Sequence, residues 1–416
     1  MSAPPSTSPP DDRRLLQLHR GPVYPPSNGE EVRIWRTAAW FRRYGDVTLA
    51  HPCEGGRTVE GVRFLDVANP ALDRKATRIY LWNALLAAGA DNPFDRLQTR
   101  QTVRTLRREG PFDVVCCESP QVLRAGVALA RHFDAHLLLN KHNAMFELLD
   151  QQLGSRPIPG TVRRRAVRQL RELEQRGIDC ADAVVFQSRR DRERFAVPDE
   201  TASAVVENGT DVAGIREGGD PAAVRESLGI DPAAFVCVFV GAYDYEPNAA
   251  AAHVVVDRLA PALPDVEFVL VGRNPPATDR ENVHAPGFVD DLPGALGMAD
   301  VALCPLTMGS GTKLKLMDYL AAGLPVVTTS VGAQGVDLVD GEHALVRETP
   351  ESMVEAVRTL RADPGRRRRL ADAAAALGST FGWETLLRGY DEVFAALTDR
   401  PPRRPKSLSL TGTPRS

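Results

Sequence analysis

The feature that most constrains this chain is a series of short, continuous apolar runs, each followed by a stretch that can form a helix. Runs that are apolar along their whole length are typical of parallel strands in sheets covered by helices on both faces. The chain has 416 residues, enough for two such domains. We therefore predict an α/β protein with two doubly wound, Rossmann-like domains. The runs are 14–20, 46–51, 112–119, 136–142, 182–188 and 203–209, and then 235–241, 267–272, 283–289, 301–306, 325–330 and 343–348.

A segment rich in Gly, Asp and Pro, residues 211–232, separates the two series of runs and is typical of a linker. We predict an N-terminal domain over residues 13–214 and a C-terminal domain over residues 215–382. The two ends of the chain, residues 1–12 and 400–416, have too few apolar residues to fold and are predicted to be disordered tails.

One crossover in the second series contains a glycine-rich loop, residues 309–311, followed by a predicted helix over residues 312–322. We expect Thr312 to be the N-cap and Gly323 the left-handed residue that ends the helix. Backbone N–H groups at such a helix start attract phosphate. Asp318, further along the helix, could accept hydrogen bonds from ribose hydroxyls. The alternative is that the glycines only close a tight turn and that Asp318 faces solvent.

Three runs of the first series end in polar residues, namely Glu118, the pair His142 and Asn143, and Ser188. The carboxyl ends of parallel strands meet at one edge of a sheet, so these ends should converge on one crevice. His142 is our main candidate for a functional role there, and the alternative is a structural histidine. Gly29 and Arg33 follow the first strand and could face the same crevice, although Arg33 fits a plain helix face equally well.

The rest of the composition limits the partners. The net charge of −3 gives no general case for nucleic acid binding, and the six cysteines lack metal-ligand spacing. No apolar run reaches the length of a spanning helix, and we expect a cytoplasmic protein.

An arginine-rich predicted helix, residues 161–177, has either a solvated polar face or a patch for an anionic acceptor or an acidic lipid surface. The second alternative implies peripheral contact with the inner membrane face through Arg163–Arg176.

Six motifs then stand in a fixed order along the chain. They are VVENGTD (205–211), FVGAYDYEPNAAA (239–251), LVGRNP (270–275), GFVDDL (287–292), the GSGT loop (309–312) and FGW (381–383). Together they resemble the motifs of family 4 of the GT-B glycosyltransferases, in its subgroup with GSGT loops. The resemblance covers nearly all of the ordered chain. It implies two domains facing a cleft, with a last helix, residues 383–399, that crosses back to the first domain.

The resemblance implies a retaining transferase that moves a sugar from a nucleotide diphosphate sugar to an acceptor hydroxyl, in polysaccharide or glycolipid synthesis. The acceptor would be a glycan or a lipid-linked glycan, and neither a cofactor nor an essential metal ion is implied. Two departures are visible: Ser310 stands where the family usually has glutamate, and the segment 243–248 lacks the usual Arg and Lys. A sugar-nucleotide epimerase and a non-catalytic nucleotide-binding protein therefore stay open as alternatives.

The resemblance also implies roles for single residues. His142 matches a histidine beside the anomeric centre, and Asp318 matches the acidic residue that binds the ribose. Lys313, Lys315 or Arg273 would stabilise the leaving diphosphate, where negative charge develops. On the acceptor side we expect Gly29, Arg33, Glu118 and Asn143. The donor-binding candidates are Gly241, Asn248, Gly272, Arg273, Phe288, Val289, Gly309, Ser310, Gly311, Thr312, Leu314 and Asp318.

Overall fold

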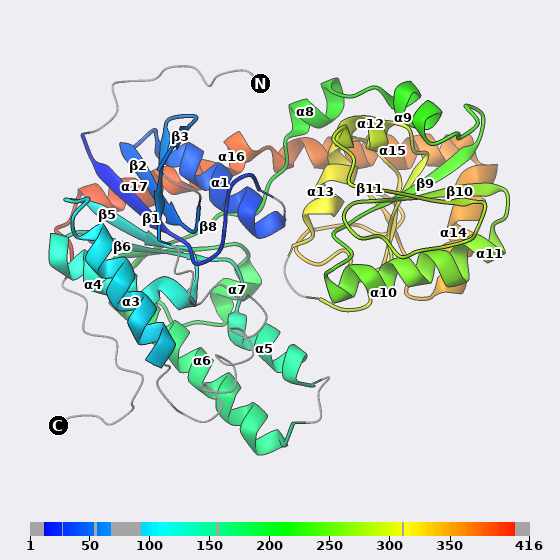
Figure 1. Cartoon of the computed structure of the whole chain (residues 1–416). Coiled ribbons are helices and arrows are strands. Elements are labelled where there is room, and N and C mark those ends of the chain that lie inside the picture. Colours follow the sequence, from blue (N-terminus) through cyan, green and yellow to red (C-terminus); the bar gives the residue numbers. More distant parts are fainter. Residues whose placement is uncertain are drawn as a thin grey trace. The chain divides into compact units, whose positions relative to one another are not determined.

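The computed structural model describes residues 12–26, 28–53, 56–67, 93–154, 158–309 and 312–403. The chain forms two compact units (Figure 1). Of the described residues, the first unit contains those up to Glu207 and those from Leu387 onward, and the second contains Asn208 to Leu386. Each unit is built on its own sheet, which confirms the predicted α/β class with two Rossmann-like units.

The sheet of the first unit contains every apolar run predicted for the first half of the chain. Its strands are β1 (Arg14–Leu18), β2 (Asp46–His51), β3 (Thr58–Val59), β4 (Val62–Asp66), β5 (Val114–Cys117), β6 (His136–Lys141), β7 (Ala183–Phe186) and β8 (Ala202–Val205). Within the described residues the order is β3-β4-β2-β1-β5-β6-β7-β8. Neighbours are parallel except β3 and β4, which form an antiparallel hairpin that we did not predict.

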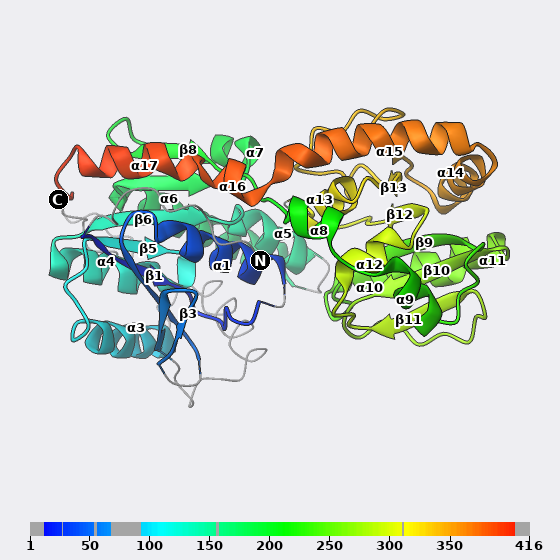
Figure 2. The same ribbon diagram turned by 90° about the horizontal axis from the view of Figure 1, so that it is seen from above.

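Helices cover the sheet of the first unit. They are α1 (Gly29–Phe41), α3 (Pro93–Leu106), η2 (Pro120–Val122), α4 (Leu123–Phe133), α5 (Met145–Gly154), α6 (Gly160–Cys180), α7 (Arg189–Glu193) and α17 (Gly389–Thr398). Helix α4 packs on β5 and β6, and α17 packs on β7 and β8 (Figure 2). The last helix of the chain therefore joins the unit in which the chain begins, as the resemblance implied.

The sheet of the second unit contains all the runs predicted for the second half. Its strands are β9 (Phe235–Val240), β10 (Val266–Val271), β11 (Val283–Gly287), β12 (Val301–Cys304), β13 (Val326–Thr328) and β14 (Leu345–Val346). They are parallel, in the order β11-β10-β9-β12-β13-β14 among the residues described. The central strands are buried along their length, which explains why their sequences are continuous apolar runs.

The helices of the second unit lie on both sides of this sheet, with α10 on one side and α9 and α12 on the other (Figure 1). They are α8 (Val212–Glu217), α9 (Pro221–Ser227), α10 (Glu246–Val254), η3 (Val255–Leu259), α11 (Ala260–Ala262), α12 (Leu292–Gly297), α13 (Leu314–Ala321), α14 (Pro350–Ala362), α15 (Pro364–Gly378), η4 (Ser379–Phe381) and α16 (Trp383–Leu387). Helix α13 is the helix predicted after the glycine-rich loop. Its C-terminal end confirms the expected cap, because Gly323 has a φ of +68°.

The first unit also holds the start of the segment that we predicted as a C-terminal tail. The backbone N–H of Arg403 donates to Asp182 over 2.8 Å. Its guanidinium donates to the carbonyl of Ala181 and to the hydroxyl of Thr201. The prediction that residues 400–403 are disordered is therefore wrong, because these hydrogen bonds fix that segment against the first unit. Residues 1–11 and 404–416 lie outside the described residues.

Candidate functional site

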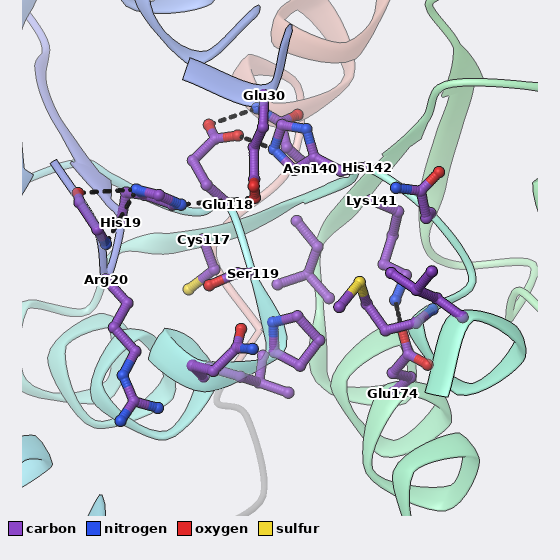
Figure 3. A pocket seen from close by; sticks show the side chains of 18 of the residues that line it. His19, Arg20, Glu30, Cys117, Glu118, Ser119, Asn140, Lys141, His142 and Glu174 are labelled. Atoms are coloured by element: carbon purple, nitrogen blue, oxygen red, sulfur yellow. Dashed lines mark hydrogen bonds and ion pairs between the residues drawn. The ribbon is translucent and has the colours of Figure 1, made fainter. Parts of the chain in front are cut away.

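The first unit contains a pocket of about 570 Å³ where the carboxyl ends of β1, β5 and β6 meet (Figure 3). Pockets of this size at such an edge are typical sites for small molecules in α/β proteins. Three residues that we predicted for the acceptor side or for catalysis line it, namely Glu118, His142 and Asn143. Gly29 and Arg33 are not among the residues that line it.

Glu118 is the centre of the polar side of this pocket. Its Oε1 accepts hydrogen bonds from Gln17 Nε2 at 2.5 Å and from Asn140 Nδ2 at 2.7 Å. Its Oε2 lies 2.7 Å from His142 Nε2. Burial on its own would raise the pKa of this carboxyl, but the hydrogen bond and charge of His142 and the two amide donors outweigh burial and lower it. Glu118 is therefore held as a carboxylate, and Tyr390 of α17 orients Asn140 by donating to its Oδ1.

His142 is fixed from both of its ring nitrogens. A carboxylate only accepts, so Nε2 carries a proton and donates it to Glu118. On the other side of the ring, Gln187 Nε2 lies 2.6 Å from Nδ1. The chain Glu118–His142–Gln187 sets the orientation of a ring that lines the pocket, as Figure 3 shows for the first two residues. The predicted convergence of two strand ends is confirmed for Glu118 and His142.

Two other residues predicted to face this crevice have structural roles. Arg33 is 2% exposed, and its guanidinium donates to the carbonyls of Val206 at 2.6 Å and Glu207 at 2.9 Å. It satisfies backbone carbonyls directly after β8, so the prediction that it faces an acceptor is replaced by this role. Ser188 caps α7, since its Oγ accepts from the N–H of Asp191. The residue beside it, Gln187, is the one that reaches His142.

Several lining residues were missed by the sequence reasoning. His19 follows β1, and its Nε2 lies 3.5 Å from Glu30 Oε1. Burial would lower the pKa of His19, but Glu30 and the backbone of Gly21 outweigh this and raise it. Across the pocket, Lys141 forms a buried ion pair with Glu174 of α6 (Figure 3). Helix periodicity gave no signal for these contacts, because each one joins residues far apart in the sequence.

In the second unit the predicted donor residues gather at the carboxyl ends of β9, β10 and β12. The turns after β9 and β10 touch: Gly272 has a φ of +130°, and a Cβ there would lie 1.8 Å from the carbonyl oxygen of Gly241. Gly272 is therefore required both for its backbone conformation and for this approach. The turn after β9 leads into α10, which contains Asn248.

Lys315 joins this turn to helix α13. Its ammonium lies 2.7 Å from Asn248 Oδ1 and 4.4 Å from the centre of the Phe239 ring. A Cβ at Gly241 would lie only 3.1 Å from the same Nζ. Burial lowers the pKa of Lys315 to about 8, a direction that the nearby charge of Lys313 reinforces. A cation is thus held at the turn where the sequence offered no Arg/Lys pair.

Helix α13 begins two residues later than predicted. Its first residue is Leu314 and its N-cap is Lys313, which gives no side-chain hydrogen bond to the first turn. The prediction of Thr312 as N-cap is wrong, because its side chain packs against Gly335, where a Cβ would lie 2.2 Å from Thr312 Oγ1. The helix start thus has no side-chain cap, which suits an anionic ligand.

The loop before this helix is described only in part. Gly309 has a φ of +120°, and a Cβ there would lie 3.7 Å from Lys313 Nζ. That ammonium is therefore close to the loop. Ser310 and Gly311 lie outside the described residues, and their predicted contacts to the donor remain predictions.

Asp318 lies on α13 and accepts a hydrogen bond from the hydroxyl of Thr210, a residue that we had not singled out. Burial raises the pKa of Asp318 to about 6, although the hydrogen bond from Thr210 acts in the opposite direction. A carboxyl group with this pKa is ionised at pH 7 and can accept hydrogen bonds from hydroxyl groups.

The other donor candidates differ in exposure. Arg273 lies 3.5 Å from Asp244, with its side chain 43% exposed, so part of its charge is already compensated at the surface. Phe288 is 70% exposed, whereas Val289 packs against the core of the unit. An exposed aromatic ring next to the strand edge can stack on a planar ligand.

Within the described residues, no three His, Cys, Asp or Glu side chains are grouped closely enough to hold a metal ion. In the same part of the chain, no helix has the length and apolar character needed to cross a bilayer.

Comparison with known protein families identifies the second unit. A family model described as "Glycosyl transferases group 1" matches residues 234–363. A D-inositol 3-phosphate glycosyltransferase from Mycolicibacterium gilvum is 30% identical over 249 residues, which are 53% of this chain and 54% of that protein. A protein of the same name from Rhodococcus jostii is 27% identical over 231 residues, 47% of each chain. The chain therefore spans about half the length of the curated relatives that it matches.

Solved structures match over nearly the whole chain. Sucrose-phosphate synthase from Thermosynechococcus elongatus has a TM-score of 0.70 at 15% identity, covering 93% of this chain and 99% of that chain. HepE from Anabaena, solved with UDP-glucose, has a TM-score of 0.64 at 17% identity, covering 92% and 99%. Similarity at this level of identity establishes a common fold, and that fold is GT-B, as the resemblance implied.

Proposed function

We propose, from the match of its second unit to the group 1 glycosyltransferases, that this chain moves a sugar from a UDP-sugar to an acceptor hydroxyl with retention of the anomeric configuration. The donor would bind in the second unit and the acceptor in the pocket of the first. UDP is chosen because HepE, which has the same fold, was solved with UDP and with UDP-glucose. Synthesis of a polysaccharide or a glycolipid is the proposed context.

One observation carries the proposal: the family match falls on the residues that bring Gly241, Asn248 and Lys315 together beside the uncapped start of α13. A cation and the backbone N–H groups of a helix start suit a diphosphate. Asp318, further along the same helix, suits a ribose. The chemistry would rest on the positions of the two substrates and on stabilisation of the departing diphosphate, where negative charge develops.

The test is thermal stabilisation of the purified protein by UDP, GDP, ADP and their glucose conjugates, without added metal. A ligand at about 100 times its dissociation constant should add roughly 2.7 kcal/mol to the free energy of unfolding. We expect a shift with the UDP compounds, and no shift with any nucleotide would contradict the proposal. An epimerase would release UDP at a rate that does not depend on an acceptor, so product analysis with and without acceptor separates that alternative.

Replacement of Asp318 by alanine should weaken UDP binding roughly 10- to 100-fold, since a hydrogen bond to a charged group contributes about 1.5–3 kcal/mol. Because its pKa is raised to about 6, UDP affinity of the wild type should also fall as the pH drops below that value. Asp318→Asn should lose this pH dependence, and Asp372→Ala on the exposed surface of α15 is the control. Calorimetric titrations that give equal affinities for the wild type and Asp318→Ala would remove the ribose role.

Peripheral contact with a membrane is a further part of the proposal. Helix α6 exposes four arginines, Arg164, Arg165, Arg168 and Arg171. Each cation near an anionic bilayer contributes about 1 kcal/mol. The double variant Arg164→Glu/Arg165→Glu should therefore bind phosphatidylglycerol vesicles at least about tenfold more weakly, whereas Arg368→Glu/Arg369→Glu on α15 should not change binding. Sedimentation with vesicles measures this, and wild-type protein that ignores anionic vesicles would disprove the contact.

A further inference from the structure

We propose that the pocket of the first unit takes an uncharged acceptor with an apolar body, of the class of alkyl or isoprenoid glycosides, and not a sugar phosphate. The inference rests on the proposed function, which places the acceptor in this pocket. It is carried by two observations on the lining, namely an apolar wall that is partly uncovered and a set of charges unsuited to phosphate.

The apolar wall is formed mainly by helix α5. Phe146, Leu149 and Leu153 of this helix are buried. Met145 and Leu148, on the side that lines the pocket, stay only partly buried. Leu170 of α6 extends the same wall and is buried. The pocket thus offers apolar side chains with surface left to cover, and the covering of such surface is the main source of affinity for apolar ligands.

The charged groups on the lining do not suit a phosphate. Three carboxylates, Glu30, Glu118 and Glu174, line the described part of the pocket together with Arg20 and Lys141. Lys141 is already paired with Glu174, and the side chains of the two are 7% and 0% exposed. Outside that pair, a phosphate would meet the carboxylates of Glu30 and Glu118 against Arg20 and the imidazole of His19, so the lining offers it no excess of positive charge. The relatives named for D-inositol 3-phosphate would differ from this chain in their acceptor.

The polar side of the pocket suits hydroxyl groups. His19 and Glu30 lie 3.5 Å apart at its lining and offer both a donor and an acceptor. Ser119 also lines the pocket, and its buried hydroxyl oxygen has no hydrogen-bond partner among the described residues. Figure 3 shows His19, Glu30 and Glu118 on one side of the pocket and the pair of Lys141 and Glu174 on another. A sugar head group can therefore meet polar groups while an attached chain meets α5.

The first experiment compares three probes by calorimetric titration of the full chain: methyl β-D-glucoside, octyl β-D-glucoside below its micelle concentration, and myo-inositol 1-phosphate. Each methylene that becomes fully buried raises affinity about fourfold. Octyl glucoside should therefore bind at least about tenfold more tightly than methyl glucoside. Equal affinities of the two glucosides, or tighter binding of the inositol phosphate, would overturn the proposal.

Variants of the wall show whether the octyl chain occupies it. Leu148→Gln should abolish the preference for octyl glucoside, because an amide then faces the chain. Leu97→Gln is the matched control, since Leu97 of α3 is 56% exposed and does not line the pocket. Met145→Gln repeats the test at a second partly buried position in case Leu148→Gln does not fold. A preference that survives in both wall variants would also overturn the proposal.

A UDP titration of the same samples separates this proposal from the proposed function. Octyl preference without UDP binding would refute the transferase and leave the apolar pocket standing. UDP binding without a preference for octyl glucoside would refute the apolar pocket and leave the transferase standing.

Discussion

Replacement of Lys315 by methionine is expected to lower kcat of sugar transfer by about 10²- to 10³-fold, the usual effect of removing one group that stabilises developing negative charge. The reason is its position: the ammonium is held by Asn248 beside the turn at Gly241 and belongs to the first turn of α13. Single-turnover rates with UDP-glucose and a responsive acceptor would measure the loss. Arg368→Met on the exposed surface of α15 is the control.

The pH dependence of kcat/KM tests the same role of Lys315 in a second way, through the pKa of its ammonium group. Burial lowers this pKa to about 8 from an ordinary value of 10.5, so the free enzyme loses the charge as the pH rises through 8. We expect kcat/KM of the wild type to fall above that pH. In Lys315→Arg the fall should move to higher pH, because a guanidinium keeps its charge. A pH profile that is the same in the wild type and in Lys315→Arg would assign the fall to another group.

As the pH rises above 8, the stability of the wild type should increase while its activity falls. Between pH 8 and 10.5 the unfolded chain binds the proton of Lys315 more tightly than the folded chain does, so the free energy of unfolding rises with pH in that range. Below pH 8 the folded protein bears the cost of a buried charge. Lys315→Met should therefore be at least as stable as the wild type at pH 7 in urea unfolding. A strongly destabilised variant would indicate a structural role.

The sheets could be predicted from the sequence because their strands are buried on both faces. Runs such as FVCVFV in β9 carry no polar residue, and this pattern is hard to produce in another way. The hairpin of β3 and β4 was missed because it is short and lies at the sheet edge. Its turn residues, Glu60 and Gly61, both have positive φ, and the Glu-Gly pair between alternating residues was a signal that could have been used.

The candidate site could be predicted only in part. Strand ends indicated Glu118 and His142, since the edge rule brings such ends together without any knowledge of side chains. The partners Gln17 and Gln187 could not be found in this way, because a glutamine inside or directly after an apolar strand has no periodic signal. Thr210 was missed for a related reason, as its contact with Asp318 depends on the packing of a loop against α13.

Replacement of His142 by alanine is expected to destabilise the protein by on the order of 3 kcal/mol, as the loss of one partner leaves a buried charge partly uncompensated. That charge is the carboxylate of Glu118, which is 1% exposed and loses its contact on Oε2. Sugar transfer should fall as well, whereas UDP binding should persist because the donor residues lie in the second unit. Urea unfolding, UDP titration and transfer rates measure the three effects separately.

The pH dependence of stability shows whether the carboxylate of Glu118 causes the destabilisation of His142→Ala. In the wild type the pKa of Glu118 is lowered below its ordinary value of 4.5, so its contribution is fully present above that pH and is lost as the pH falls through the folded-state pKa. Without His142 the pKa of Glu118 rises, and acid unfolding should begin at a higher pH. The double variant Glu118→Gln/His142→Ala should recover much of the stability at pH 7, because the unpaired charge is gone.

Transfer in that double variant decides between the two roles of His142. If the histidine acts beside the reacting sugar, activity stays low although the fold is restored. If its only task is to hold Glu118, activity should return together with stability in Glu118→Gln/His142→Ala. Gln187→Leu adds an independent check, because it leaves the hydrogen bond between His142 and Glu118 in place but removes the one that orients the ring at Nδ1. A catalytic His142 then predicts a loss of kcat with little loss of stability.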